Sequence, residues 1–305
     1  MPITKLDQMF EVLKQKNTKK RIVGVWAIDS HTISALSKAV DLGIVDATLV
    51  GDEKLIKKVC KQENIEINKF EIFHADADVD AANKAIDIIN SGKSDILMKG
   101  LLSTDKYMRA ILNKEKGLVP PKGVLSHVTV IENPIHDKLI ICGDVAVIPF
   151  PDLKQKIAIT NYLINTAHAL DIEKPKVALL AATEQVLPSM PACVDAAILS
   201  KMGDRGQIKG AVLDGPFSFD IAIDKESAQI KGIDSEVAGD ADCFLFPNIE
   251  SGNIFYKTNT KLAGAEVAAA VAGARVPAIL SSRSDSVKTK LYSIALGAML
   301  AKKQK

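Results

Sequence analysis

A polar turn near the carboxyl end of the chain combines residue types that bind anions. Residues 277–286 are typical of an apolar strand that runs through a turn into a helix, and Arg283 lies in that turn between Ser282 and Asp285. In open α/β sheets, ligands bind at the carboxyl ends of strands, and the N–H groups that begin a helix favour an anion. A guanidinium can bind phosphate through two parallel hydrogen bonds, which lysine cannot do. A second interpretation is equally open, in which Ser284 or Asp285 only caps the helix and Arg283 is a surface residue.

A second junction of the same kind follows a predicted strand in the first half of the chain. Lys99 ends that strand, Gly100 allows a tight turn, and Ser103 and Thr104 begin a helix that carries Arg109. Hydroxyl and backbone N–H groups there could bind phosphate, with Arg109 about one and a half turns further along the helix. An ordinary Ser or Thr cap with a solvated Arg109 fits the same residues.

Two further strand ends are polar. Gly215 and Pro216 follow a buried strand, and a glycine lets a ligand approach the backbone closely. The other strand end is rich in amides and ends in a lysine, and its candidate substrate-binding residues are Asn248, Gly252, Asn253 and Lys257. Gly, Pro and Asn are also what ordinary turns use. Four polar strand ends in one α/β chain favour a ligand site over turn chemistry alone.

Ser126 and His127 are neighbours in the sequence. A catalytic Ser–His pair needs adjacency in space rather than in sequence, and the chain has no GxSxG motif. We therefore exclude a serine hydrolase and expect His127 to be structural or to face a ligand.

Strands and helices alternate in the way that would place these junctions at one edge of a sheet. Short apolar runs predict strands at residues 21–27, 47–50, 70–74 and 95–99, and amphipathic stretches predict helices at 30–42, 54–62, 79–89 and 104–112. Two β-rich runs, 123–131 and 139–148, follow without an intervening helix. The alternation then resumes, with helices expected at 261–272 and 287–301 among others. This pattern predicts a mostly parallel sheet covered on both faces.

The length of 305 residues fits two domains better than one. We expect two three-layer αβα domains. The first comprises residues 1–135 with 282–305, and the second, inserted domain comprises residues 136–281. Two contiguous halves are the simpler alternative.

Composition excludes several functions. The formal net charge is only +2, from 39 Lys and Arg residues against 37 Asp and Glu residues, which argues against a nucleic-acid binder. The polar N-terminus has no apolar signal segment, and no stretch is typical of a membrane span. The chain has no HExxH, GxxxxGK[ST] or GxGxxG motif and no CxxC pair. We expect a cytoplasmic protein without a metal or a membrane partner. Only Arg21, Arg109, Arg205, Arg275 and Arg283 are arginines, and two of them lie at the junctions described above.

Together these stretches resemble the phosphate acetyl/butyryl transferase family, and the details are similar to its butyryl branch. The resembling blocks occur in order over most of the chain: Met98 to Gly100 with Ser103, Thr104 and Arg109; Ser126 and His127; Gly143 to Pro149; Asp214 to Asp220; Pro247 to Lys257; Ser282 and Arg283.

The resemblance implies an isopropylmalate-dehydrogenase-like fold with the active site in a cleft between two domains, and a homodimer or higher homo-oligomer. It implies the reaction of butyryl-CoA with phosphate to give butyryl phosphate and CoA, with CoA as a substrate and no bound cofactor. Phosphate acetyltransferase activity on acetyl-CoA is the alternative. The resemblance places Ser282 and Arg283 in the active site and Arg109 at a ligand. Acetyl-specific members carry a proposed catalytic aspartate at the position of Thr289. The resemblance therefore leaves three alternatives here: Asp285 substitutes for it, base catalysis is weaker, or water relays the proton.

The expected mechanism is direct attack of the CoA thiolate on the acyl phosphate carbonyl in a ternary complex. Ser282 would hydrogen-bond the sulfur, Arg283 would neutralise the phosphate and the developing oxyanion, and the residues from Lys99 to Arg109 would hold phosphate. Two other classes stay open, a metal-dependent NAD oxidoreductase on the same fold and a non-catalytic CoA-binding protein.

Overall fold

Buried strands alternate with helices through most of the chain, as the sequence predicts. The computed structural model describes residues 1–16, 19–280 and 285–302. The predicted catalytic residues Ser282 and Arg283 lie outside the described residues. The chain divides into two compact units. The first comprises residues 6–125 and 267–305 and is called the terminal unit; the second comprises residues 1–5 and 126–266 and is called the central unit.

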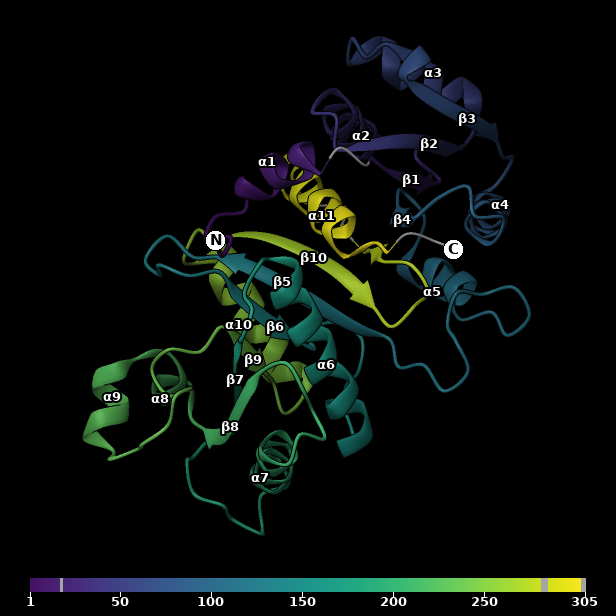
Figure 1. The fold of residues 1–305 in the computed structure, drawn as a ribbon. Coiled ribbons are helices and arrows are strands. Elements are labelled where there is room, and N and C mark those ends of the chain that lie inside the picture. The colour runs from purple at the N-terminus through teal and green to yellow at the C-terminus, as the bar shows by residue number, and fades with distance from the viewer. Residues whose placement is uncertain (17–18, 281–284, 303–305) are drawn as a thin grey trace. The chain divides into compact units, whose positions relative to one another are not determined.

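The terminal unit is a mostly parallel sheet with helices (Figure 1). Its strand order is β3–β2–β1–β4–β11–β10, and only the pairing of β10 with β11 is antiparallel among those described for this unit. The strands are β1 (Lys20–Val25), β2 (Val45–Gly51), β3 (Phe70–His74), β4 (Ile96–Lys99), β10 (Glu266–Ala272) and β11 (Ala278–Ile279). The helices are α1 (Gln8–Gln15), α2 (Ser30–Asp41), α3 (Glu53–Gln62), α4 (Asp78–Asn90), α5 (Thr104–Ile111) and α11 (Val287–Leu300), with a 3₁₀ turn at Ile67–Lys69.

The central unit has the strand order β5–β6–β9–β7–β8, in which only β5 and β6 run antiparallel among the described pairs. Its strands are β5 (Ser126–Glu132), β6 (Ile140–Gly143), β7 (Lys176–Leu180), β8 (Val212–Phe217) and β9 (Cys243–Leu245). Its helices are α6 (Leu153–Ala169), α7 (Pro191–Asp204), α8 (Phe219–Ile223), α9 (Lys225–Ile230) and α10 (Ile249–Lys261).

Side-chain caps fix where several helices begin, and these starts place the candidate residues. The Asp29 carboxylate accepts a hydrogen bond from Thr32 N at 2.9 Å, and Ser103 accepts one from Lys106 N at 3.3 Å. Ser286 accepts one from Thr289 N at 3.1 Å. Such caps satisfy backbone donors that the helix itself cannot pair. Each of these three helices follows the carboxyl end of a strand, since α2 comes after β1, α5 after β4 and α11 after β11.

One predicted element near residue 260 is wrong. The expected helix at 261–272 is instead strand β10 over Glu266–Ala272. The alanines of β10 favour a helix intrinsically, but the strand is almost entirely buried and pairs with β11. Burial in a sheet outweighs that propensity. The polar segment after Asn248 forms helix α10, and Asn248 caps it by accepting a hydrogen bond from Ser251 N at 3.0 Å.

The two compact units divide the chain at residues 5, 125 and 266, and the domain boundaries at residues 135 and 281 stay a prediction. Strand β5 groups with the central unit because it pairs with β6, whereas β10 groups largely with the terminal unit because it pairs with β11. Among the described residues, no helix is long and apolar enough to cross a membrane.

Candidate active site

Helix α11 begins a few residues after the predicted catalytic residues Ser282 and Arg283 in the sequence. Asp285 lies just before it, and Ser286, rather than Asp285, is the N-cap of the helix. The hydroxyls of Ser286 and Thr289 lie 3.0 Å apart and bond to one another. One turn of helix therefore brings Asp285, Thr289 and Lys290 to the same end of α11.

A cavity of about 170 Å³ lies in the terminal unit against α11. Its lining residues come from the start of α2, from the turn after β4 and from α11: Asp29, Ser30, His31, Thr32, Gly100, Leu101 and Lys290. Strands β1 and β4 are parallel neighbours, so these segments meet at the carboxyl edge of the sheet. This is the edge at which α/β sheets bind ligands.

Gly100 is required in the wall of this cavity by a close approach of two chain segments. Its N–H donates to Val25 O at 2.9 Å, and the next N–H donates from Leu101 to Trp26 O at 3.0 Å. A Cβ atom at Gly100 would lie 2.5 Å from Trp26 O. The tight turn expected at Gly100 is therefore present, and it serves chain packing as well as shaping the cavity.

A buried amine faces carboxylates in this region. The Lys290 side chain is only 3% exposed, and burial lowers the pKa of its ammonium group, while the Asp29 and Asp285 carboxylates oppose that shift. Lys99, also buried, donates from Nζ to Gly100 O at 3.3 Å. The cavity thus combines positive charge, one lining carboxylate and the backbone N–H groups of a helix start.

The predicted phosphate-binding residues divide between this cavity and the surface. Gly100 lines the cavity, Lys99 donates a hydrogen bond to Gly100 O, and Ser103 and Thr104 begin α5 as expected. The Arg109 side chain is 79% exposed, and its Nε lies 3.0 Å from the Asp105 carboxylate, one turn earlier on α5.

Ser126 and His127 are brought together with a buried carboxylate in the central unit. Asp144 is 2% exposed and accepts five hydrogen bonds, from Ser126 Oγ, His127 N, Ala146 N, Val147 N and Ile148 N. The His127 ring lies 3.2 Å from Thr129 Oγ1. Both predicted residues therefore anchor the loop that follows β6.

The same loop contacts the start of α10. A Cβ atom at Gly252 would lie 2.3 Å from Asp144 O, so only glycine lets the helix pack this closely. Asn253 Nδ2 donates to Val145 O at 3.0 Å. The structure therefore joins Ser126, His127, Gly252 and Asn253 through the loop that begins at Asp144.

The other predicted substrate-binding residues have separate surroundings. Gly215, at φ +146°, lies near the end of β8, where a Cβ atom would meet Leu179 O at 2.5 Å. Pro216 follows it in β8. Lys257 lies on α10 with its Nζ 4.8 Å from the centre of the Tyr256 ring.

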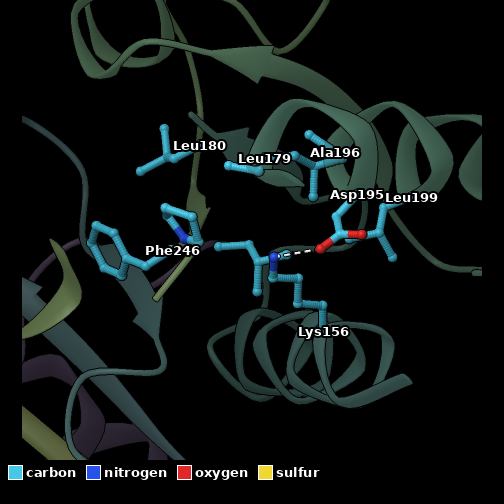
Figure 2. Close-up of a pocket in the computed structure, with 10 residues that line it drawn as sticks. Lys156, Leu179, Leu180, Asp195, Ala196, Leu199 and Phe246 are labelled. Atoms are coloured by element: carbon cyan, nitrogen blue, oxygen red, sulfur yellow. Dashed lines mark hydrogen bonds and ion pairs between the residues drawn. The ribbon is translucent and has the colours of Figure 1, made fainter. Parts of the chain in front are cut away.

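Figure 2 shows an ion pair in the central unit that sequence reasoning missed. Lys156 of α6 lies 2.6 Å from the Asp195 carboxylate of α7, beneath an apolar wall that includes Leu179 and Phe246. The cavity there measures about 10 Å³, which holds one water at most. This ion pair therefore links α6 to α7, and the cavity beside it has no room for a ligand larger than a water molecule.

Asp29, His31 and Lys290 were also missed from the sequence. The signal was present, because Asp29 to Thr32 follow a buried strand and begin a helix, the same pattern that singled out the other junctions. Lys290 gave no signal, since a lysine in a helix is ordinarily solvated. Among the described residues, no group of three or more His, Cys, Asp or Glu side chains could hold a metal ion.

Known proteins are similar to this chain in sequence and in fold over almost its whole length. A family model described as phosphate acetyl/butaryl transferase matches residues 74–298. The chain is 44% identical to phosphate butyryltransferase of Clostridium acetobutylicum, covering 98% of this chain and 99% of that protein. It is 37% identical to phosphate acetyltransferase of Thermotoga maritima, covering 97% and 99%. The structure matches a branched-chain phosphotransacylase from Enterococcus faecalis with a TM-score of 0.80 and 26% identity, covering 92% and 98%. The chain belongs to the phosphate acetyl/butyryl transferase family.

Proposed function

We propose that the protein transfers a short acyl group between CoA and inorganic phosphate, with butyryl-CoA and phosphate giving butyryl phosphate and CoA. The observation that carries this proposal is the 44% identity to a phosphate butyryltransferase over 98% of the chain. The chain is 37% identical to the relative that is named phosphate acetyltransferase. Butyryl transfer is therefore favoured, and acetyl transfer is the alternative. CoA is a substrate, the protein needs no resident cofactor, and the reaction takes place in the cytoplasm.

Direct thiolate attack in a ternary complex is the proposed mechanism. Ser282 hydrogen-bonds the sulfur, and Arg283 neutralises the phosphate and the developing oxyanion. Asp285 completes the proposed catalytic set, and its position just before α11 and close in sequence to Ser282 and Arg283 supports this choice. A thiol of pKa ~8.5 is only a few per cent ionised at neutral pH, so a base beside it contributes about 10²–10⁴-fold in rate.

Phosphate binding is assigned to the junction between β4 and α5, with Lys99, Gly100, Ser103, Thr104 and Arg109. The buried Lys99 at the end of β4 and the start of α5 support this assignment, because both favour an anion.

CoA binding is assigned to residues of the central unit. The loop that begins at Asp144 supports the choice of four of them, since it contacts Ser126, His127, Gly252 and Asn253. The proposed residues are Ser126, His127, Gly215, Pro216, Asn248, Gly252, Asn253 and Lys257.

Replacing Arg109 with alanine is expected to raise the KM for phosphate about 10-fold or more, since a hydrogen bond to a charged group contributes about 1.5–3 kcal/mol. The thermal midpoint should stay almost unchanged, because an exposed i,i+4 ion pair contributes only about 0.3–0.5 kcal/mol. Steady-state kinetics with varied phosphate provide the measurement.

Asp105→Ala is the matched control for this variant, since it removes the same ion pair and keeps the guanidinium. It should leave the KM for phosphate near the wild-type value. An unchanged KM in Arg109→Ala would remove Arg109 from the phosphate site.

A series of acyl-CoA substrates tests the function itself. CoA release is measured from acetyl-, propionyl-, butyryl- and longer acyl-CoA, each with and without phosphate. We expect phosphate-dependent release with the greatest kcat/KM for butyryl-CoA. A maximum at acetyl-CoA would instead establish the acetyltransferase. Binding of CoA without any thiol release would indicate a non-catalytic binding protein, and nicotinamide reduction would indicate the oxidoreductase.

A homodimer is proposed on the basis of apolar surface in the central unit. Ile254 of α10 is 66% exposed and Leu262 just beyond it is 85% exposed. Ile254 also lines an apolar cavity of about 440 Å³ with Phe219 and Phe255. Exposed apolar patches of this kind mark interaction sites. The isopropylmalate-dehydrogenase-like architecture expected from the sequence is part of the same proposal.

Ile254→Glu is expected to convert the dimer to a monomer, because the introduced charge would be buried without a partner in the interface. Light scattering coupled to size-exclusion chromatography measures the mass. Val79→Glu, which introduces the same charge at a half-exposed position on α4, is the control and should stay dimeric. A dimer of unchanged stability in Ile254→Glu would place the interface elsewhere.

A further inference from the structure

The two oxygens of the Asp29 carboxylate have different surroundings. Oδ1 accepts a hydrogen bond from Thr32 N at 2.9 Å and so caps α2. Oδ2 is buried and has no hydrogen-bond partner among the described residues. A buried carboxylate oxygen that lacks a donor costs free energy, and such an atom in a native structure calls for an explanation. The helix cap accounts for the position of Oδ1, but it does not explain why Oδ2 is buried without a partner.

A cavity adjoins this carboxylate. Asp29 lines the cavity of about 170 Å³ at the carboxyl edge of the terminal unit's sheet, together with Gly100 and Lys290. One water needs only about 10–15 Å³ of such a volume. The space beside Asp29 therefore admits a substrate group as well as solvent. Turning of the carboxylate toward a group that donates a hydrogen there would give Oδ2 its missing partner.

The charged groups around Asp29 favour a hydrogen-bond donor that becomes negatively charged when it loses its proton. Lys290 of α11 is buried and interacts electrostatically with Asp29 and with Asp285. Lys99, buried at the end of β4, and His31, at the start of α2, are the other titratable groups around the cavity. A thiol fits these surroundings, because its proton can go to a carboxylate while the ammonium group of Lys290 stabilises the sulfur anion.

Other groups near the start of α11 are less suited to accept the proton. The hydroxyls of Ser286 and Thr289 bond to one another and are not bases at neutral pH. The Asp285 carboxylate interacts electrostatically with Lys290. Among the described residues, however, Asp29 is the one carboxylate that lines the cavity.

We propose that Asp29, through Oδ2, is the base that accepts the proton of the CoA thiol. The inference rests on the proposed acyl transfer. As the S–H bond breaks, the proton moves to Asp29 and the sulfur forms a bond to the acyl carbon. The bond between that carbon and the phosphate oxygen then breaks, and its electron pair leaves with the phosphate. The proton on Asp29 passes to the departing phosphate, which leaves as hydrogen phosphate, and the carboxylate is restored.

Asp29→Asn separates this role from the helix cap. Asparagine caps a helix about as well as aspartate, so the bond from Thr32 N is kept while the proton acceptor is lost. Asp52→Asn is the matched control, because Asp52 caps α3 in the same way and lies away from the cavity. Asp29→Ser, which also caps a helix, provides a second variant should Asp29→Asn fold poorly.

The rate of acyl-CoA formation from butyryl phosphate and CoA is measured from pH 6 to pH 9 for all variants. We expect Asp29→Asn to lower kcat about 10²–10⁴-fold at neutral pH. Its deficit should shrink as the pH approaches ~8.5, because the thiol then ionises without a base. Asp52→Asn should match the wild type throughout.

Three outcomes would overturn the inference while the wild type is active. Asp29→Asn could match the wild type, its deficit could be the same at every pH, or only its KM for butyryl phosphate could rise, which would assign Oδ2 to binding of the phosphate group. His31→Gln tests the imidazole beside Asp29, and a pH-dependent deficit in that variant in place of Asp29→Asn would transfer the role to His31. An inactive wild type would instead refute the proposed function.

Discussion

Alanine at position 283 is expected to lower kcat about 10²–10³-fold, with little change in the folded state. Arg283 is proposed to neutralise charge that grows on the phosphate and the oxyanion in the transition state. Removal of one preorganised donor at a developing oxyanion costs about 2.7–4 kcal/mol of barrier. Fixed-time assays of CoA release from butyryl-CoA measure kcat, and circular dichroism checks that the variant is folded.

Two further variants make this experiment specific. Arg283→Lys keeps the charge but loses the two parallel hydrogen bonds of a guanidinium, so its activity should fall between alanine and the wild type. Arg205→Ala removes an exposed arginine at the end of α7 that has no proposed role, and it should leave kcat unchanged. An unaffected rate in Arg283→Ala would refute the assignment.

Asp144→Asn is expected to destabilise the protein by about 3–5 kcal/mol, which is the range for breaking a buried charged network. The carboxylate accepts five hydrogen bonds, and an amide would present an N–H group to donors that need an acceptor. At about 2–4 °C per kcal/mol, the thermal midpoint should fall by roughly 10 °C. Differential scanning fluorimetry measures the shift.

Ser126→Ala is the graded control, because it removes one of the five donors to Asp144. It should cost only about 1 kcal/mol. A midpoint within about 2 °C of the wild type for Asp144→Asn would show that the loop after β6 does not depend on this carboxylate.

The sequence predicts the alternation of strands and helices well, because buried parallel strands are nearly continuous apolar runs. The strand at β3 and the start of helix α5 follow directly from this pattern, with Ser103 as the residue that begins the helix. The strand β10 could not be predicted in this way. Its alanines carry no strand signal of their own, and only burial and pairing with β11 define it.

The candidate site follows the same division. Polar residues after a strand identify Gly100, Ser103 and Asp285 from the sequence. Asp29 and Lys290 line the same cavity although about 260 residues of chain separate them, and no local pattern encodes that proximity. The buried network of Asp144 is likewise a product of folding, since its donors come from β5 and from the loop after β6.

The central claim is acyl exchange between CoA and phosphate, and product identification tests it most directly. Butyryl-CoA is incubated with the purified protein and phosphate, while free thiol is followed by colour reaction and phosphorus species by ³¹P NMR. The account predicts that CoA and butyryl phosphate appear in equal amounts and that neither forms without phosphate. Thiol release that does not need phosphate, or release without an acyl phosphate signal, would contradict it.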